Sequence, residues 1–170
     1  MHDLQGHLIL ASKMEWSDVL NIINNNAEDA RLEFKESPFL GTPKEIAIQL
    51  VSLANRYGGR ILVGIKDDGR VEGAKMDMDH ESLAILNVAH NNSSPPVEVG
   101  FDHATSPNAE DVLIINVSRR KGIPHAVVDR KAAEIYKRTY YVRSGSTNRL
   151  VDDIMLQYMF EHVNDPNLTI

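Results

Sequence analysis

The chain has 170 residues, 42% hydrophobic and 25% charged, and no cysteine, which suits one globular domain and excludes disulfide frameworks and thiolate zinc sites. Its net charge of −6 argues against a protein that coats phosphates over its whole surface. No apolar run approaches the roughly 18 residues that cross a bilayer, and no basic segment precedes a hydrophobic one at the start. We therefore expect a cytoplasmic single domain over residues 1–170, with its core within about 15–163 and no membrane partner.

The first elements are a helix and a strand. Ser12 and Glu15 have the spacing of a capping box, which predicts a helix that ends in the asparagine run at 24–26. Polar and apolar residues alternate over 31–35, which predicts a strand with one face in a core and the other, with Glu33, turned away from it.

A second helix follows with clear boundaries. Thr42 and Glu45 form another capping box, and Pro43 suits the first helical position. Gly58-Gly59 is typical of a left-handed helix cap, although two glycines also let a backbone approach a phosphate closely. The continuous apolar run 61–65 then predicts a strand in the centre of a sheet.

Strands dominate the second half of the chain. Asp68-Gly69 is typical of a tight turn, after which we expect residues 71–74 to return antiparallel. The remaining elements that we expect are a helix at 77–90, strands at 97–101, 111–117 and 139–143, and a final helix at about 150–162. This order indicates an α+β fold, a mixed β-sheet flanked by helices.

Residues 118–150 are the most basic part of the chain, with nine basic residues against two acidic ones, a local balance of +7 against −13 for the rest. Tyrosines lie among these cations, a mixture that suits bases stacking on rings while cations hold phosphates. Strand alternation lets only one of Tyr140 and Tyr141 face that surface. A solvated surface, or a plain turn at 144–146, explains the same residues equally well. The nucleic-acid contacts that we expect are Arg119, Arg120, Lys121, His125, Lys137, Arg138, Tyr140, Arg143, Ser144 and Ser146.

Several segments together resemble the Schlafen AlbA_2 domain, formerly called a divergent AAA domain. The resemblance rests, in order, on Arg31-Leu32-Glu33-Phe34-Lys35, Leu53-Ala54-Asn55 with Gly58-Gly59, Leu62-Val63-Gly64-Ile65, Asp68-Gly69 and Tyr140-Tyr141-Val142-Arg143-Ser144-Gly145-Ser146. It implies the fold of that family and nucleic acid, RNA or DNA, as the partner. The old family name implies ATP, but the sequence has no Gly-x-x-x-x-Gly-Lys-Ser/Thr loop.

The resemblance also implies a candidate catalytic site. In vertebrate Schlafen proteins, two glutamates spaced like Glu28 and Glu33 and an aspartate after the Gly-Gly strand form the site of an RNA endonuclease. Asp67 or Asp68 would be that aspartate here. Carboxylates gathered without matching cations repel one another, so a shared Mg²⁺ or Mn²⁺ is one reason to bring them together, with Lys35 steadying charge on the phosphate. A solvated loop, an ordinary outward strand pair and a plain turn explain the same residues.

Two functions of different classes follow from these features. One is a metal-dependent endoribonuclease, and the other is a non-catalytic DNA-binding transcriptional regulator, which is how many prokaryotic members of the family are regarded. ATP binding is a third possibility. Because one copy is small for the two-lobed clamp of larger relatives, we also expect a homodimer.

Overall fold

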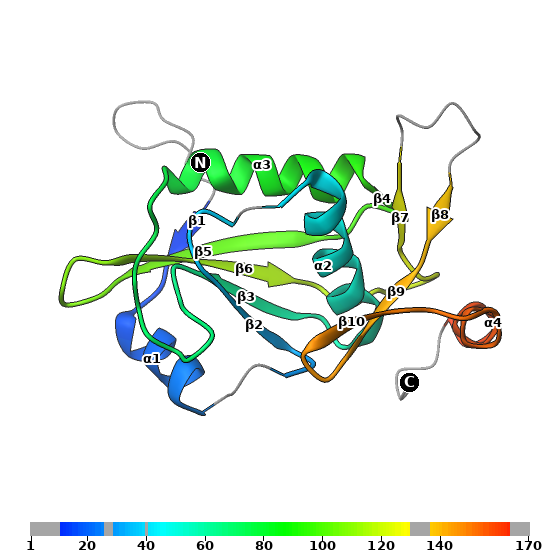
Figure 1. Ribbon diagram of the computed structural model, residues 1–170, viewed down its shortest axis with the longest axis horizontal. Helices are drawn as coiled ribbons and strands as arrows, with labels where there is room; N and C mark the ends of the chain where they lie inside the picture. The colour runs from blue at the N-terminus through cyan, green and yellow to red at the C-terminus, as the bar shows by residue number, and fades with distance from the viewer. Residues whose placement is uncertain (1–10, 26–28, 40, 130–136, 164–170) are drawn as a thin grey trace.

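The centre of the molecule is a mixed five-stranded sheet with the strand order β1-β5-β6-β3-β2 (Figure 1). In the sheet, β1 (Ala11–Lys13) runs parallel to β5 (Val99–Thr105), β2 (Leu32–Lys35) runs parallel to β3 (Gly59–Val63), and β6 (Asp111–Val117) runs antiparallel to both β3 and β5. The structure is a computed structural model and describes residues 11–25, 29–39, 41–129 and 137–163. It confirms the predicted mixed sheet.

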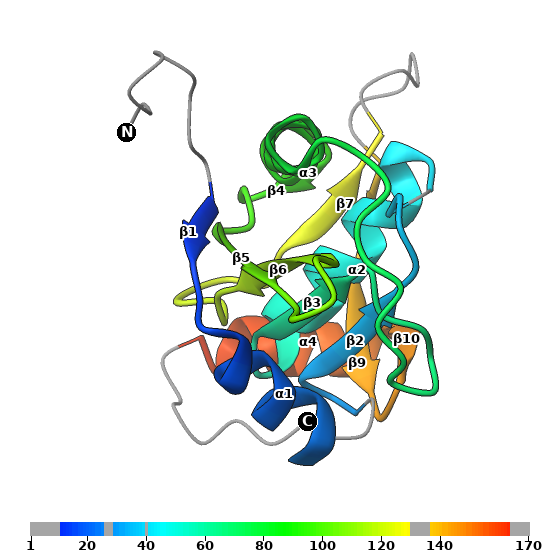
Figure 2. The same cartoon turned by 90° about the vertical axis from the view of Figure 1, so that its left-hand side faces the viewer.

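Helices cover both faces of this sheet. On one face lie α2 (Pro43–Arg56) and α3 (Met78–Asn91), and on the other lies α1 (Trp16–Asn25) (Figure 2). The larger core gathers Leu50 of α2 with inward residues of β3 and β6, and the smaller core gathers Val19 of α1 with residues from the opposite face. No helix in the described ranges is long and apolar enough to span a bilayer.

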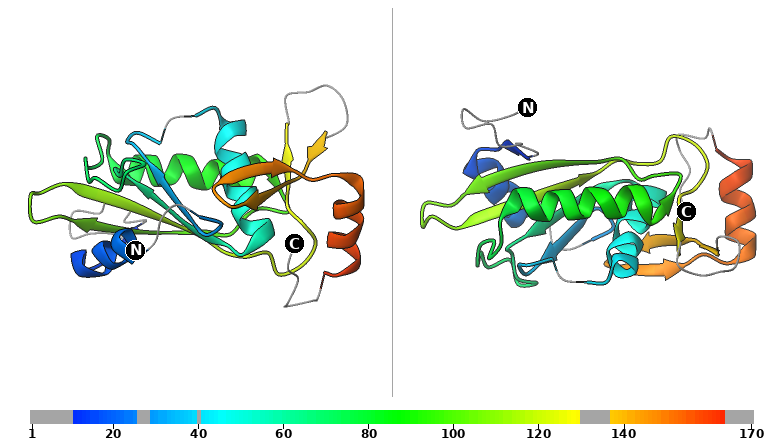
Figure 3. Two further views of the ribbon diagram at one scale, coloured as in Figure 1. Left: turned by 60° about the horizontal axis from the view of Figure 1, so that its bottom comes forward. Right: turned by 90° about the horizontal axis from the view of Figure 1, so that it is seen from above.

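One end of the sheet carries the last quarter of the chain (Figure 3). A three-stranded sheet consists of β4 (Ser93–Ser94), β7 (Ala126–Val128) and β8 (Arg138–Thr139). A hairpin of β9 (Tyr141–Ser144) and β10 (Thr147–Leu150) packs on α2 and leads into α4 (Asp153–Glu161). The hairpin therefore lies over the starts of β2 and β3, where the candidate site is built.

The predicted boundaries of the second helix are confirmed. Thr42 Oγ1 accepts a hydrogen bond from the Glu45 backbone N–H (3.2 Å), and Glu45 Oε2 accepts one from the Thr42 N–H (2.7 Å). At the other end Gly58 has a φ of +70° and its N–H donates to the Leu53 carbonyl (2.8 Å). A Cβ on Gly58 would lie 2.6 Å from the Val117 carbonyl oxygen, so the cap also needs glycine for space.

The structure corrects several predicted elements. The first helix begins at Trp16 and not near Ser12, because Ser12 lies in β1 and pairs with β5. The predicted strand at 139–143 is interrupted at Tyr140, since β8 pairs with β7 whereas β9 pairs with β10. Of the residues 71–74, only Val71 forms a bridge, to Ile65. The short strands β1, β4, β7 and β10 were not predicted.

Candidate nucleic-acid interface

Glu33 is buried at the edge of the sheet between two cations. Its Oε1 lies 2.5 Å from Lys35 Nζ, and its Oε2 accepts a hydrogen bond from Arg143 Nη2. The Arg143 side chain is only 1% exposed and also donates to Asn148 Oδ1 (3.1 Å) and to the Asp29 carbonyl (3.3 Å). The Glu33–Arg143 pair therefore ties the β9–β10 hairpin to the start of the central sheet.

The two aspartates after β3 are exposed and lie in a turn. The backbone N–H (3.0 Å) and the Nε (2.6 Å) of Arg70 both donate to Asp68, and these hydrogen bonds lower the pKa of the Asp68 carboxyl. Glu33 pairs in register with Ile61, whereas Asp67 and Asp68 lie in the turn beyond the end of β3 at Val63. Among the described residues, neither aspartate shares a hydrogen bond or an ion pair with Glu33, whose two oxygens face Lys35 and Arg143.

The described carboxylates do not fit a bound Mg²⁺ or Mn²⁺. Both oxygens of Glu33 face cations, and the oxygens of Asp68 are taken by Arg70. Across the described ranges, no group of three or more His, Cys, Asp or Glu residues could hold a metal ion. The predicted site also needs Glu28, which lies outside the described residues. The three-carboxylate site therefore stays a prediction.

Three of the expected nucleic-acid contacts lie in the interior. Arg143 is held in the pair with Glu33, and Arg120 is 9% exposed and donates to the Gly122 carbonyl. The ring Nδ1 of His125, also 9% exposed, lies 2.7 Å from the Pro95 carbonyl oxygen. Burial lowers the pKa of His125, which disfavours the cationic ring that would attract a phosphate. These positions do not suit a contact with phosphate.

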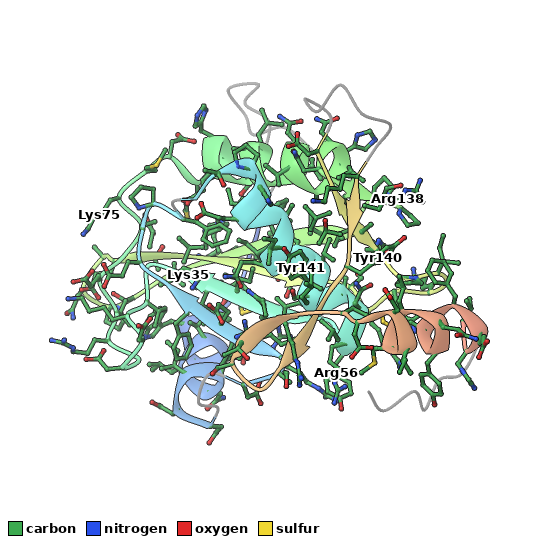
Figure 4. The ribbon with its side chains drawn as sticks, turned by 45° about the vertical axis from the view of Figure 1, so that its right-hand side comes forward. Lys35, Arg56, Lys75, Arg138, Tyr140 and Tyr141 are labelled. Carbon is green, nitrogen blue, oxygen red and sulfur yellow. The ribbon has the colours of Figure 1, made fainter. Side chains whose placement is uncertain are left out.

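The other expected contacts lie nearer the surface. Lys121 Nζ pairs with Glu98 Oε2 (3.1 Å), and both side chains are exposed. The Tyr140 ring packs edge-on against Phe160, with centroids 6.0 Å apart, whereas Tyr141 packs against the larger core (Figure 4). Tyr140 is thus the tyrosine of the two that faces away from that core. Arg119 is half-buried, and the exposed members of the set besides Lys121 are Lys137, Arg138, Ser144 and Ser146.

A group of cations that the sequence did not single out gathers at the end of α2. The guanidinium carbon of Arg31 lies 4.7 Å from the centre of the Tyr57 ring, and that of Arg56 lies 4.8 Å from it. Arg60 is exposed at the start of β3, and its Nε donates to Asn116 Oδ1 (3.2 Å). Within the described part of the chain, none of these three guanidinium groups pairs with a carboxylate. We call Arg31, Arg56, Arg60 and Tyr57 the arginine–tyrosine cluster.

Two surface hollows adjoin this cluster. The larger, of about 440 Å³, is lined by Arg31 and Arg60 together with Asp29 and Asn116. The smaller, of about 260 Å³, is lined by Arg56, the β9–β10 hairpin and the start of α4. Arg31 and Arg60 line one hollow and Arg56 lines the other, while the guanidinium groups of Arg31 and Arg56 both lie on Tyr57. Each hollow therefore has at least one arginine of the cluster in its wall.

The fold explains why these arginines gather. In the parallel β2–β3 pair, Leu32 pairs with Arg60, and the Arg60 N–H donates to the Arg31 carbonyl (2.8 Å). Helix α2 ends one turn before β3 begins, which places Arg56 and Tyr57 at the same end of the sheet. The sequence could have shown this gathering. A strand–helix–strand pattern predicts two parallel strands, and the starts of two parallel strands are neighbours in the sheet.

The sequence model of the Schlafen, AlbA_2 family matches residues 28–152. Two solved structures are similar to this fold. The chain is 19% identical to the DIP2311 protein of Corynebacterium diphtheriae, with a TM-score of 0.53 over 88% of this chain and 28% of that one. It is 20% identical to the N-terminal domain of an ATP-dependent DNA helicase RecG-related protein of Nitrosomonas europaea, with a TM-score of 0.51 over 82% of this chain and 95% of that domain. None of the curated proteins matches.

Proposed function

Because the family model covers residues 28–152, the chain belongs to the Schlafen AlbA_2 family, and we propose that it binds nucleic acid through the arginine–tyrosine cluster. The observation that carries the proposal is the Tyr57 ring, which has two guanidinium groups on it, neither of them in an ion pair with a carboxylate of the described residues. Arginine matches the geometry of phosphate oxygens, and a guanidinium plane held on an aromatic ring can also stack on a base. The cluster therefore offers both kinds of contact at one place.

The arginines of the cluster differ from many other described cations, which form ion pairs. Many other described cations have a carboxylate partner, so their charge is locally balanced: Lys35, Lys66, Arg70, Lys75, Lys121 and Arg143. A cation that already has a partner gains less from a phosphate, because the existing pair must be broken or shared. The unpaired arginines are thus the better candidates for phosphate contacts.

The exposed residues at β8 are further candidates for contact with nucleic acid. Lys137 and Arg138 are exposed, and Tyr140 lies next to them in the chain and faces away from the core (Figure 4). We therefore keep these three as further contacts. The RecG-related protein is named for a DNA helicase, which is consistent with a nucleic-acid ligand for this fold. The proposal is a binding function and needs no metal.

The experiment measures the binding of labelled single-stranded RNA, single-stranded DNA and duplex DNA by fluorescence anisotropy. Arg60→Gln removes one unpaired cation at an exposed position and should leave the fold intact. We expect it to weaken binding roughly tenfold and to lower the slope of log K against log salt by about 0.7–0.9 per lost phosphate contact. Tyr57→Leu should weaken binding of single strands more than that of the duplex, because it removes the ring that holds the two guanidinium planes on which unpaired bases would stack.

Lys121→Gln is the matched control. It removes the same charge from an exposed side chain, but that charge is already paired with Glu98. We expect a change of less than about twofold. If wild-type protein retains none of the three nucleic acids at low salt, or if Lys121→Gln weakens binding as much as Arg60→Gln, the proposed interface is wrong.

A further inference from the structure

The smaller hollow beside the cluster is walled by three elements. Arg56 reaches it from the end of α2, Ser144 and Arg149 come from the two strands of the hairpin, and Asp152 and Met155 come from the start of α4. These segments are far apart in the chain and meet only because the hairpin packs on α2 and then turns into α4. The hollow is therefore a product of the fold and not of a local motif.

One side chain at this hollow has a polar atom without a partner in the described part of the chain. The Nε of Arg56 is buried and makes no hydrogen bond with any described residue. A buried donor without an acceptor is unfavourable, and such a group calls for an explanation. An anion in the hollow would lie beside the Arg56 side chain, which lines it, and a small turn of the guanidinium would let the Nε donate to that anion. The exposed Arg149 and the Ser144 hydroxyl add further donors at the same place.

The charges around the hollow favour an anion. Arg56 and Arg149 have no carboxylate partner among the described residues, whereas the charge of Arg143 is balanced by Glu33. Asp152 opposes an anion, but its Oδ1 accepts the Met155 N–H (2.8 Å) as the cap of α4. The start of that helix contributes about half a positive charge, which offsets part of the carboxylate. Positive charge therefore remains in excess.

The size of the hollow limits its ligand. Its volume is about 260 Å³, whereas sites that enclose a drug-sized molecule measure roughly 300–1,000 Å³. One phosphate group with its sugar fits this volume, and a run of nucleotides does not. Leu150, Val151 and Met155 form an apolar wall against which a sugar can pack.

We propose that this hollow binds the phosphomonoester at the end of a nucleic-acid chain whose next nucleotides lie along the arginine–tyrosine cluster. The inference rests on the proposed nucleic-acid binding and adds the chemical class of the ligand's end. A terminal phosphate carries about −1.5 to −2 charges and three acceptor oxygens, more than a bridging phosphodiester offers. It therefore suits a hollow with a hydroxyl and two arginines that form no ion pair with the described carboxylates.

The experiment compares three labelled oligonucleotides of one sequence, with a 5′-phosphate, with a 3′-phosphate and with neither. The wild-type protein should bind one of the two phosphorylated forms roughly tenfold tighter than the unphosphorylated form. The difference in affinity between the two phosphorylated forms shows whether the hollow binds a 5′-phosphate or a 3′-phosphate. Arg149→Gln should reduce this ratio of dissociation constants to below about twofold, because it removes an exposed cation of the hollow.

Arg60→Gln is the matched variant for the other hollow. It should weaken binding of all three oligonucleotides and keep the ratio between them, because Arg60 lines only the larger hollow. If the wild-type protein binds the three oligonucleotides with equal affinity, the smaller hollow does not bind a terminal phosphate, while the proposed nucleic-acid binding still stands. A ratio that Arg149→Gln leaves unchanged also overturns it. Absence of binding to all three overturns the proposed function itself.

Discussion

The buried pair between Glu33 and Arg143 makes a sharp prediction about stability. Glu33→Gln keeps the shape of the side chain and removes its charge. The guanidinium of Arg143, which is 1% exposed, would then keep a full positive charge with only neutral acceptors, Asn148 Oδ1 and the Asp29 carbonyl. Lys35 also loses its partner, but its side chain is 30% exposed, so water compensates for much of that loss.

The expected loss follows from the burial of Arg143. Removing one partner of a buried ion pair costs about 3–5 kcal/mol, because the other charge stays buried and unpaired. The amide oxygen that replaces the carboxylate can still accept one hydrogen bond from Arg143, which returns about 1 kcal/mol. We therefore expect Glu33→Gln to lower the free energy of unfolding by about 2–4 kcal/mol. In a domain of this size, that lowers Tm by about 5–15 °C.

Urea unfolding followed by the fluorescence of Trp16, the single tryptophan, measures this loss. The matched control is Glu98→Gln, the same change in the exposed pair with Lys121, which should shift stability by less than about 0.5 kcal/mol. A Glu33→Gln midpoint equal to that of Glu98→Gln would refute the reasoning. It would also favour a Glu33 that serves chemistry, because a carboxylate used only to hold a metal is dispensable for folding.

Three further predictions concern pH, metal and assembly. Burial raises the pKa of Glu81, whose Oε1 accepts the Phe39 N–H. The protonated Glu81 carboxyl therefore stabilises the folded state below about pH 4.5, and this contribution is lost as the pH rises through the folded-state pKa. Glu81→Gln, which cannot ionise, should raise Tm more in melts near pH 8 than near pH 5. Because Glu33 is held by Arg143, labelled tRNA should stay intact equally with Mn²⁺ and with chelator; cutting with Mn²⁺ alone, abolished by Glu33→Gln, would contradict this and support the carboxylate site with Glu28. The homodimer expected from the sequence predicts twice the monomer mass in light scattering, and a monomeric mass throughout the micromolar range would contradict it.

Sequence reasoning succeeded where the determinants are local. The capping box at Thr42 and the glycine after Tyr57 set the ends of α2 through contacts within a few residues, so α2 lies where predicted. The strand at 111–117 also has its predicted limits, because every residue of β6 pairs with β5 and its apolar run is long. The strands β4, β7 and β10 have two to four residues and exist only through their tertiary partners, which a local pattern does not contain.

The candidate site was harder to predict because its determinants are distant in the chain. Alternation correctly put Glu33 on the face opposite to Leu32, but it could not show that the β9–β10 hairpin covers that face with Arg143. The count of basic residues located charge in 118–150, yet Arg120 and Arg143 there are buried. Charge along a sequence does not distinguish a cation that pairs inside the fold from one that faces solvent.

Several residues that carry the family resemblance have structural roles. Asn55 Nδ2 donates to the carbonyls of His125 (2.8 Å) and Tyr141 (2.9 Å), and Asn55 Oδ1 accepts the His125 N–H (2.8 Å). One buried amide thus joins α2 to the starts of β7 and β9, and the Glu33–Arg143 pair joins β9 to β2. These contacts explain why the resemblance predicted the fold well. They also separate fold from function, since residues that are fully engaged inside the protein have little left to offer a ligand. The binding that we propose therefore rests on cations that form no ion pair among the described residues, such as Arg31 and Arg56 on the Tyr57 ring.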